Sequence, residues 1–372
     1  MKRASMLTLA TCLFLAAPFA HAQGSLIVHE WGTITTRHSR DGTPQGRLNR
    51  IDPAEVLPAF VHRFEPQQTS ATPQTSFRKG TDTPGRPDVT MRLETPVLYF
   101  YRDGNAAAPA AFDVSVQLRG GILNEFYPDA QASTGRDAGR MESKIAAQAI
   151  KPGDPIVLDD YLLGRLAWNG ISLNPAARPP QTDSAIWNAP RNVRAEKLST
   201  AAGEGEHYLF YRGVAHLEAL LQTRHSPSEV QLRAPRHLHW MPVPEMTISQ
   251  LWLVDVHADG ALAFAAREQT TIAKHAPLAQ LVGMKMFSAQ QYGNSQRAAL
   301  RESMRSALIN AGLYDDEADA MLATWNASYF QTAGLRVFYV VPREWIEYFL
   351  PLELSVPHRS TRVLIGRIDL ID

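Results

Sequence analysis

Two histidines separated by a single residue, His237 and His239, have the most metal-like spacing in the sequence. On a β-strand, side chains two residues apart project from the same face, and paired imidazoles of this kind bind zinc or copper. A third ligand would have to come from elsewhere in the chain. The alternative is that the pair lies in a surface loop, because prolines stand on both sides of it.

A second pair, His29 and Glu30, suits metal ligation or acid–base catalysis. It begins like the H-E-x-x-H zinc motif, but Thr33 occupies the position of the second histidine. On a regular strand, His29 and Glu30 also project from opposite faces, so only a bulge would let them act together. The simpler interpretation is that each side chain is partly buried and satisfied by a neighbouring group.

Two aromatic segments, each followed by an arginine, suit a ligand-binding cleft. They contribute Tyr99, Tyr101, Arg102, Tyr211 and Arg212. Aromatic faces together with guanidinium groups bind flat, polar ligands such as sugars and peptides. The alternative is that alternate rings of two strands simply belong to the core.

The best-known catalytic signatures are absent from the sequence. It contains no G-x-S-x-G, H-E-x-x-H, P-loop or G-x-G-x-x-G phrase, and its single cysteine is Cys12. We therefore leave open whether the chain is an enzyme.

The elements that must position these residues are mainly strands. The segments 26–35 and 93–101 are rich in β-branched and aromatic residues, and the apolar residues of 112–119 alternate with polar ones. Further strands are expected at 156–158, 165–173, 208–211, 229–232, 249–256 and 261–267. Loops with proline and glycine separate them, which favours antiparallel sheets over βαβ units. The segment 64–90 is polar, contains four prolines and is expected to be a mobile loop.

The last quarter of the chain changes character. Leu300, Met304 and Leu308 are spaced four apart, which predicts a helix over 296–311, and a second helix is expected from Asp315 or Asp316 onwards. A buried strand at 335–341, a short helix from residue 342 and strands at 352–356 and 361–371 follow.

Together these patterns predict an α+β fold. Its parts are a β-rich, antiparallel, sandwich-like body (23–272) and a C-terminal part (273–372), in which a helix pair and an α/β closing unit pack on the body.

The N-terminus predicts a cleavable signal peptide over residues 1–22. Lys2 and Arg3 precede a short apolar segment, and Ala20-His21-Ala22 suits signal peptidase. The apolar segment is shorter than the roughly 20 residues of a membrane span. Cleavage at Cys12, as in a lipoprotein, would leave an apolar end. We therefore expect a periplasmic or secreted protein whose mature chain contains no cysteine.

The charge and hydropathy of the sequence argue against nucleic acid as the main partner and against a transmembrane helix after the N-terminal segment. The sequence has 37 Lys and Arg and 37 Asp and Glu, and cleavage would remove two of the basic residues and no acidic one. The resulting slight negative charge argues against nucleic acid as the main partner. No later segment is apolar for long enough to predict a transmembrane helix.

Several phrases resemble those of an uncharacterised family of exported bacterial proteins. They occupy residues 28–33 (VHEWGT), 93–101 (LETPVLYFY), 209–213 (LFYRG), 312–314, 340–345 (VVPREW), 350–352 and 362–367. The resemblance implies one shared architecture and export, and it assigns no activity or catalytic residue.

We therefore expect a periplasmic or envelope-associated binding module whose partner is a small molecule, a glycan or an envelope component. The alternative is a metal-assisted hydrolase of envelope polymers or peptides that uses His29, Glu30, His237 and His239 with zinc or copper.

Export has a direct test. The complete three-part leader predicts that protein recovered from the periplasm or medium begins at Gln23. N-terminal sequencing checks this, and an intact Met1 would contradict it.

Overall fold

The computed structural model describes residues 26–49, 56–66, 85–104, 109–137, 139 and 156–372. The predicted signal peptide lies outside these residues, as does 67–84 of the predicted loop at 64–90. Within the described part of the chain, no helix has both the length and the apolar character needed to cross a membrane.

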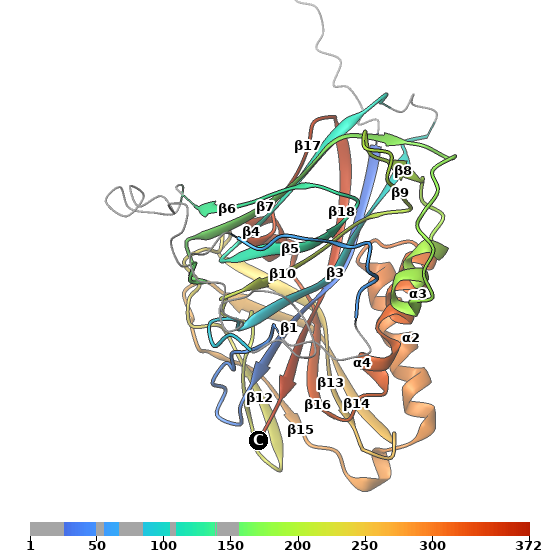
Figure 1. Ribbon diagram of the computed structural model, residues 1–372. Coiled ribbons are helices and arrows are strands. Elements are labelled where there is room, and N and C mark those ends of the chain that lie inside the picture. Colours follow the sequence, from blue (N-terminus) through green and yellow to red (C-terminus); the bar gives the residue numbers. More distant parts are fainter. Residues whose placement is uncertain (1–25, 50–55, 67–84, 105–108, 138, 140–155) are drawn as a thin grey trace, which may run out of the picture.

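A large central sheet organises the described residues (Figure 1). In spatial order its strands are β14 (Leu262–Ala273), β13 (Glu245–Val256), β16 (Gly334–Val340), β18 (His358–Leu370), β1 (Leu26–His38), β3 (Met91–Arg102), β10 (Leu209–Ala215), β5 (Gly121–Tyr127) and β2 (His62–Arg63). The first and last long strands, β1 and β18, pair in parallel, and the other neighbours in this sheet pair antiparallel.

Two smaller sheets share a hydrophobic core with one face of the central sheet. One contains β17 (Leu352–Leu354), β4 (Phe112–Arg119), β7 (Leu162–Leu173), β8 (Leu198–Ser199), β9 (Gly205–Glu206) and, beside β7, β6 (Gln131–Arg136). The other contains β11 (Gln222–His225), β12 (Glu229–Arg233) and β15 (Gln280–Lys285). The shared core includes Val28 and Phe100 of the central sheet and Val114, Trp168 and Leu232 of the smaller sheets.

Helices cover the opposite face of the central sheet (Figure 1). They are α1 (Ala185–Asn188), α2 (Asn294–Asn310), α3 (Asp315–Thr324) and α4 (Asn326–Phe330), with the 3-10 turn η2 (Ala189–Asn192) beside α1. The predicted stripe Leu300, Met304 and Leu308 is buried in this second core with Trp31 and Phe338. A further 3-10 turn, η3 (Ala289–Gln291), precedes α2, and α5 (Arg343–Phe349) lies on the sandwich side, where its apolar residues join the first core.

A bulge in β3 accounts for the proline in the segment 93–101 and for the glycine in the segment 28–33. Thr95 adopts a positive φ of 46° and Pro96 follows it, and the pairing of β3 with both neighbours shifts register there. Proline is tolerated inside a sheet mainly at such bulges. A Cβ at Gly32 would lie 3.0 Å from the Cα of Pro96, so the close approach of β1 and β3 favours glycine at that position.

Strand β16 leaves the central sheet earlier than its neighbours. It pairs with β13 as far as Tyr339 and with β18 as far as Val340, and the last backbone hydrogen bond runs from Val341 N to Leu364 O. Pro342 follows and begins the turn into α5. Strands β13 and β18 continue past this point, so a gap one strand wide opens between them.

The expected fold class is confirmed, because the described residues form a β-rich α+β fold with mostly antiparallel pairing. The parallel β1–β18 pair is a departure from that expectation. The predicted strand at 156–158 is wrong, since those residues form no strand, and β5, β6, β11 and β15 were not predicted. The proposed division at residue 273 stays a prediction, although β16 and β18 lie between strands of the first part.

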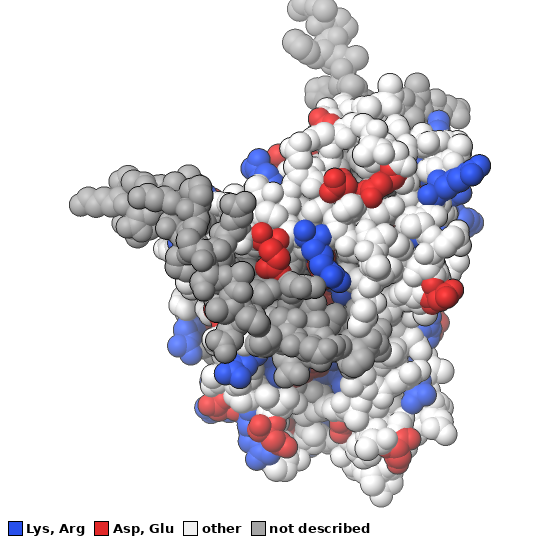
Figure 2. Space-filling model, viewed as in Figure 1, with Lys and Arg blue, Asp and Glu red and all other residues white. Residues whose placement is uncertain are grey.

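Acidic and basic side chains are interspersed on the face shown in Figure 2 and do not gather into one patch there. This distribution agrees with the balanced composition of the chain.

Gly366 tests the packing of the central sheet. A Cβ at this position would overlap the ring of Tyr339 on β16. We expect Gly366→Ala to lower the free energy of unfolding by about 1–3 kcal/mol, as overpacking of a core does.

Gly135→Ala is the matched control, because it also lies in a strand and its Cβ would meet open space. Urea denaturation of both variants checks the prediction, and an equal loss of stability in the two would contradict it.

Candidate functional site

A pocket of about 240 Å³ occupies the gap that β16 leaves in the central sheet. Ala311, Val363 and the chain around Pro342 line it, together with four hydroxyl-bearing residues and two arginines: Thr247, Ser249, Ser360, Thr361, Arg343 and Arg362. We call it the Arg362 pocket. Thr247 and Ser249 are exposed, and Ser360 and Thr361 are half-buried, so the pocket opens to solvent.

Two strands flank the Arg362 pocket, and each is paired on one side only. Residues 245–250 of β13 pair with β14, and pairing with β16 begins at Leu251. Residues 358–363 of β18 pair with β1, and pairing with β16 begins beyond them. In the described part of the chain no other strand pairs with these edges, so they carry backbone donors and acceptors open to a ligand.

The side chain of Arg362 forms an ion pair with a buried carboxylate. Its Nε lies 2.6 Å from Oε2 of Glu30, whose other oxygen accepts a hydrogen bond from the Tyr211 hydroxyl. Glu30 and Tyr211 are fully buried, and the Arg362 side chain is 6% exposed. Parallel pairing places Glu30 directly beside Arg362 in the sheet, so the fold itself brings these two charges together.

The electrostatics keep this cluster charged at Arg362. Burial lowers the pKa of the Arg362 guanidinium, but Glu30 and Tyr211 raise it by more, so the net shift is upward. Burial, followed by the charge of Glu30, raises the pKa of the Tyr211 hydroxyl well above its ordinary range. Tyr211 therefore remains a hydrogen-bond donor to Glu30 at all ordinary pH values.

One nitrogen of Arg362 is left over from this network. Its Nη2 is fully buried and has no acceptor within hydrogen-bond distance among the residues that the structure describes. The Tyr211 hydroxyl also interacts with this guanidinium, and Arg362 is one of the residues that line the pocket. A buried guanidinium N–H without an acceptor is costly, and a carboxylate is the acceptor that guanidinium groups bind best. The pocket is therefore suited to an anionic group.

The lining of the pocket suits binding better than catalysis. Among the residues that line it there is no histidine, cysteine, aspartate or glutamate, so no side chain there can serve as a general base at neutral pH. Hydroxyls and guanidinium groups supply hydrogen bonds and positive charge. The arrangement can orient a ligand, and it offers no acid–base pair.

The structure separates His29 from Glu30, as regular strand geometry requires. His29 faces the helices, where its Nδ1 lies 2.8 Å from Oε2 of Glu317. The Tyr101 hydroxyl donates to the other Glu317 oxygen at 2.6 Å, and the backbone N–H of Tyr314 also donates to this carboxylate. Glu30 faces the sandwich core. The structure therefore does not bring His29 and Glu30 together, because each has a different partner.

The structure also does not bring the residues of the predicted aromatic cleft together. Tyr99, Tyr211 and Arg212 are buried at 0–1% exposure. Tyr99 lies in the core beneath the helices and Tyr211 in the core of the sandwich, so the two rings are on opposite faces of the sheet. Arg212 donates to Thr95, and the exposed Arg102 pairs with Glu196. These side chains stabilise the fold and do not form one binding surface.

His237 and His239 lie in an exposed loop and not on a strand. Their ring centroids are 6.4 Å apart, and Nδ1 of His237 lies 3.2 Å from Glu218. Both rings line a small pocket of about 40 Å³. Among the described residues, no three or more His, Cys, Asp or Glu side chains are grouped so that they could hold a metal ion. The zinc or copper site that the sequence suggested is therefore not assembled from these residues.

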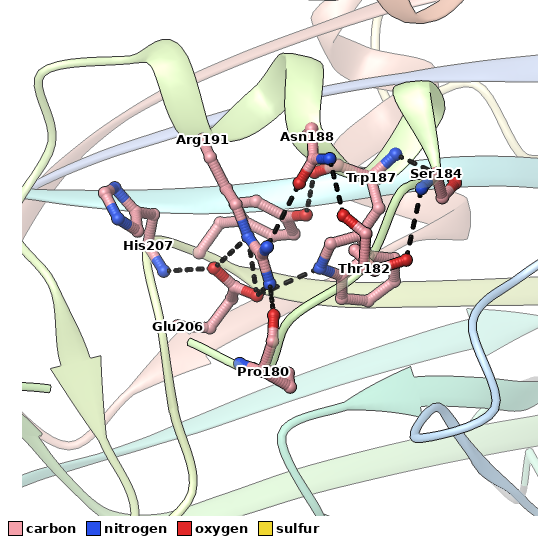
Figure 3. Close-up of polar contacts among 9 residues, drawn as sticks. Pro180, Thr182, Ser184, Trp187, Asn188, Arg191, Glu206 and His207 are labelled. Carbon is pink, nitrogen blue, oxygen red and sulfur yellow. Dashed lines mark hydrogen bonds and ion pairs between the residues drawn. The ribbon is translucent and has the colours of Figure 1, made fainter. Parts of the chain in front are cut away.

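A further buried carboxylate, Glu206, is fully used in holding a loop (Figure 3). It accepts hydrogen bonds from Trp187 Nε1 at 3.0 Å, from Arg191 Nη2 at 2.6 Å and from the backbone N–H of His207. Burial, outweighing the charge of Glu206, lowers the pKa of the His207 imidazole. This network ties α1 and η2 to β9, and its saturated bonds indicate a structural role.

Sequence reasoning did not assign chemistry to Arg343 or Arg362. Both residues belong to phrases that carry the family resemblance, and Pro342 was recognised as a helix start. The missing information was spatial, because a strand that ends at a proline creates a pocket only when both its neighbours continue.

The Glu30–Arg362 pair can be tested by a double-mutant cycle. We expect Glu30→Gln and Arg362→Met each to lower the free energy of unfolding by about 3–5 kcal/mol, because each leaves a buried charge without its partner. The double variant should lose at least about 1 kcal/mol less than the sum. Urea denaturation measures all four proteins, and strictly additive losses would contradict the pairing.

Comparisons with known proteins assign no family. No family model matches the chain, and no curated protein matches it. Similar solved structures include the yeast delta-COP-I mu-homology domain, with a TM-score of 0.26 and 9% identity over 93% of this chain and 96% of that one. Another is the Fcho1 mu homology domain of Danio rerio with a bound Eps15 peptide, with a TM-score of 0.26 and 7% identity over 94% and 95%. These scores are too low to support an inference about fold or function.

Proposed function

We propose that this protein is an exported binding module without catalytic activity that captures a carboxylate-bearing ligand in the Arg362 pocket. The observation that carries the proposal is that Arg362 lines the pocket and that its buried Nη2 has no acceptor within hydrogen-bond distance among the described residues. A carboxylate at this position would complete the hydrogen bonding of the guanidinium.

Preorganisation supports the proposal. The guanidinium is fixed by Glu30 and is almost fully buried, so little side-chain entropy is lost when a ligand binds. Water is largely excluded around it, which strengthens a charge-assisted hydrogen bond. Arg343 adds a second positive charge at the solvent side of the pocket.

Export remains part of the proposal. It is supported by the three-part leader at residues 1–22 and by the resemblance to exported proteins. A periplasmic or envelope location would expose the pocket to the carboxylates of peptides and envelope polymers.

The alternative, a metal-assisted hydrolase, finds less support. His29 pairs with Glu317, Glu30 with Arg362, and His237 with Glu218. The side chains that such a mechanism would need to converge are therefore committed to three different neighbours.

The proposal predicts selective binding of acidic probes. We expect N-acetyl-triglutamate to bind saturably and N-acetyl-trilysine amide not to bind, as measured by two-dimensional amide NMR titration. Arg362→Lys should abolish binding while the protein stays folded, because lysine keeps the charge but cannot reach Glu30 and the ligand together. Arg343→Gln should weaken binding about fivefold, as expected for one exposed charge.

Arg359→Gln is the control for Arg343→Gln. The two side chains are similarly exposed, at 66% and 69%, and each makes one ion pair, but Arg359 does not line the pocket. The proposal fails if both probes bind alike, or if Arg362→Lys binds triglutamate as the wild type does.

A further inference from the structure

We infer that the ligand of the Arg362 pocket is an extended, acidic peptide that adds a strand to the central sheet where β16 has left it. This inference rests on the proposed function and specifies the class of ligand.

The width of the gap suits one strand. Where β16 is present, it is hydrogen-bonded to β13 on one side and to β18 on the other. Neighbouring strands lie about 4.8 Å apart, so β13 and β18 are separated by about 9.5 Å there. Beyond Val340 the two strands continue without β16, and they are not paired with each other. The space between them is the Arg362 pocket.

Both walls of the gap offer backbone groups. The open edge of β13 spans residues 245–250, and the open edge of β18 spans residues 358–363. An inserted peptide of about six residues would run along both edges. Its successive N–H and C=O groups would point alternately to β13 and to β18, so every central residue would be hydrogen-bonded.

Sheet geometry also fixes the direction of the peptide. Strand β16 runs antiparallel to both neighbours, and a peptide that continues its position in the preferred antiparallel arrangement would have its N-terminal end next to Pro342. Arg362 lies near that end of the gap, because it is two residues from Leu364, whose carbonyl accepts the last hydrogen bond from the β16 side. We therefore expect an aspartate or glutamate near the N-terminal end of the peptide, with its carboxylate on Nη2 of Arg362.

A peptide explains the pocket better than a sugar or a simple anion does. A simple anion would use the guanidinium and leave both strand edges open, and a sugar offers no regularly spaced N–H and C=O groups. A peptide uses the charge and the two edges together, and the exposed hydroxyls of Thr247 and Ser249 border its path.

The test begins with a phage-displayed library of random linear octapeptides selected on the mature wild-type protein. The blocking variant is Thr247→Trp, which places a ring in the pocket. The control is Thr271→Trp, because Thr271 is the exposed cross-strand partner of Thr247 on β14 and does not line the pocket. Selected peptides should be enriched in acidic residues near their N-terminal end. They should bind at least about tenfold more weakly to Thr247→Trp than to Thr271→Trp.

A backbone N-methylation scan of the best peptide gives the decisive result. Insertion between two strands predicts that methylation at each of several consecutive positions weakens binding about threefold to tenfold, because each N–H donates to one neighbour or the other. Weakening at every second position only would indicate addition to one edge and would overturn insertion. Uniform insensitivity would overturn strand addition altogether.

The two proposals fail in different ways. Triglutamate binding that depends on Arg362, combined with an insensitive N-methylation scan or with no peptides selected, would contradict strand insertion and leave the carboxylate site standing. Absence of triglutamate binding to the wild type would remove the proposed function itself.

Discussion

Proline has no backbone N–H, and Pro342 stands where β16 would otherwise continue between β13 and β18. The chain turns there into α5, whose apolar residues are buried in the sandwich core. Strand β13 is fixed by β14 and strand β18 by β1, so neither can move in to close the gap. The interior of the central sheet therefore contains two open edges, which natural sheets usually cover.

Parallel pairing of β1 with β18 determines the chemistry of this gap. It sets Glu30 beside Arg362 across 332 positions of sequence, and the buried hydroxyl of Tyr211 completes the cluster. A buried ion pair is weak evidence for stability, since apolar residues of the same volume often do as well. In the function proposed above, the role of this pair is to hold the arginine side chain rigidly beside the pocket. Glu317 and Glu206 are also fully buried carboxylates. Their hydrogen bonds, however, connect a helix or helical turn to a strand.

The sequence predicted those elements whose periodicity is local. Strand β4 and helix α2 follow from alternation and four-residue spacing, and their boundaries agree closely with the structure. Pairing register is not local, and for that reason the sequence did not show that the predicted aromatic residues lie on different faces of the sheet. Phe210 lies opposite Val97, which puts Tyr211 on the opposite face of the sheet from Tyr99. The parallel β1–β18 pair and the gap beside Pro342 depend on the order of strands in space, which hydrophobic patterns do not encode.

Hydrogen exchange along β13 tests the central claim most directly. In the free protein, amides of residues 245–250 include some that face the gap, whereas residues 251–256 lie between two paired strands. Mass-spectrometric exchange should show faster labelling of the first segment than of the second, and likewise for residues 358–363 of β18 relative to 365–370. A selected acidic peptide should slow exchange in both open segments at once. Equal protection along the whole of β13 and β18 in the free protein would contradict the open gap.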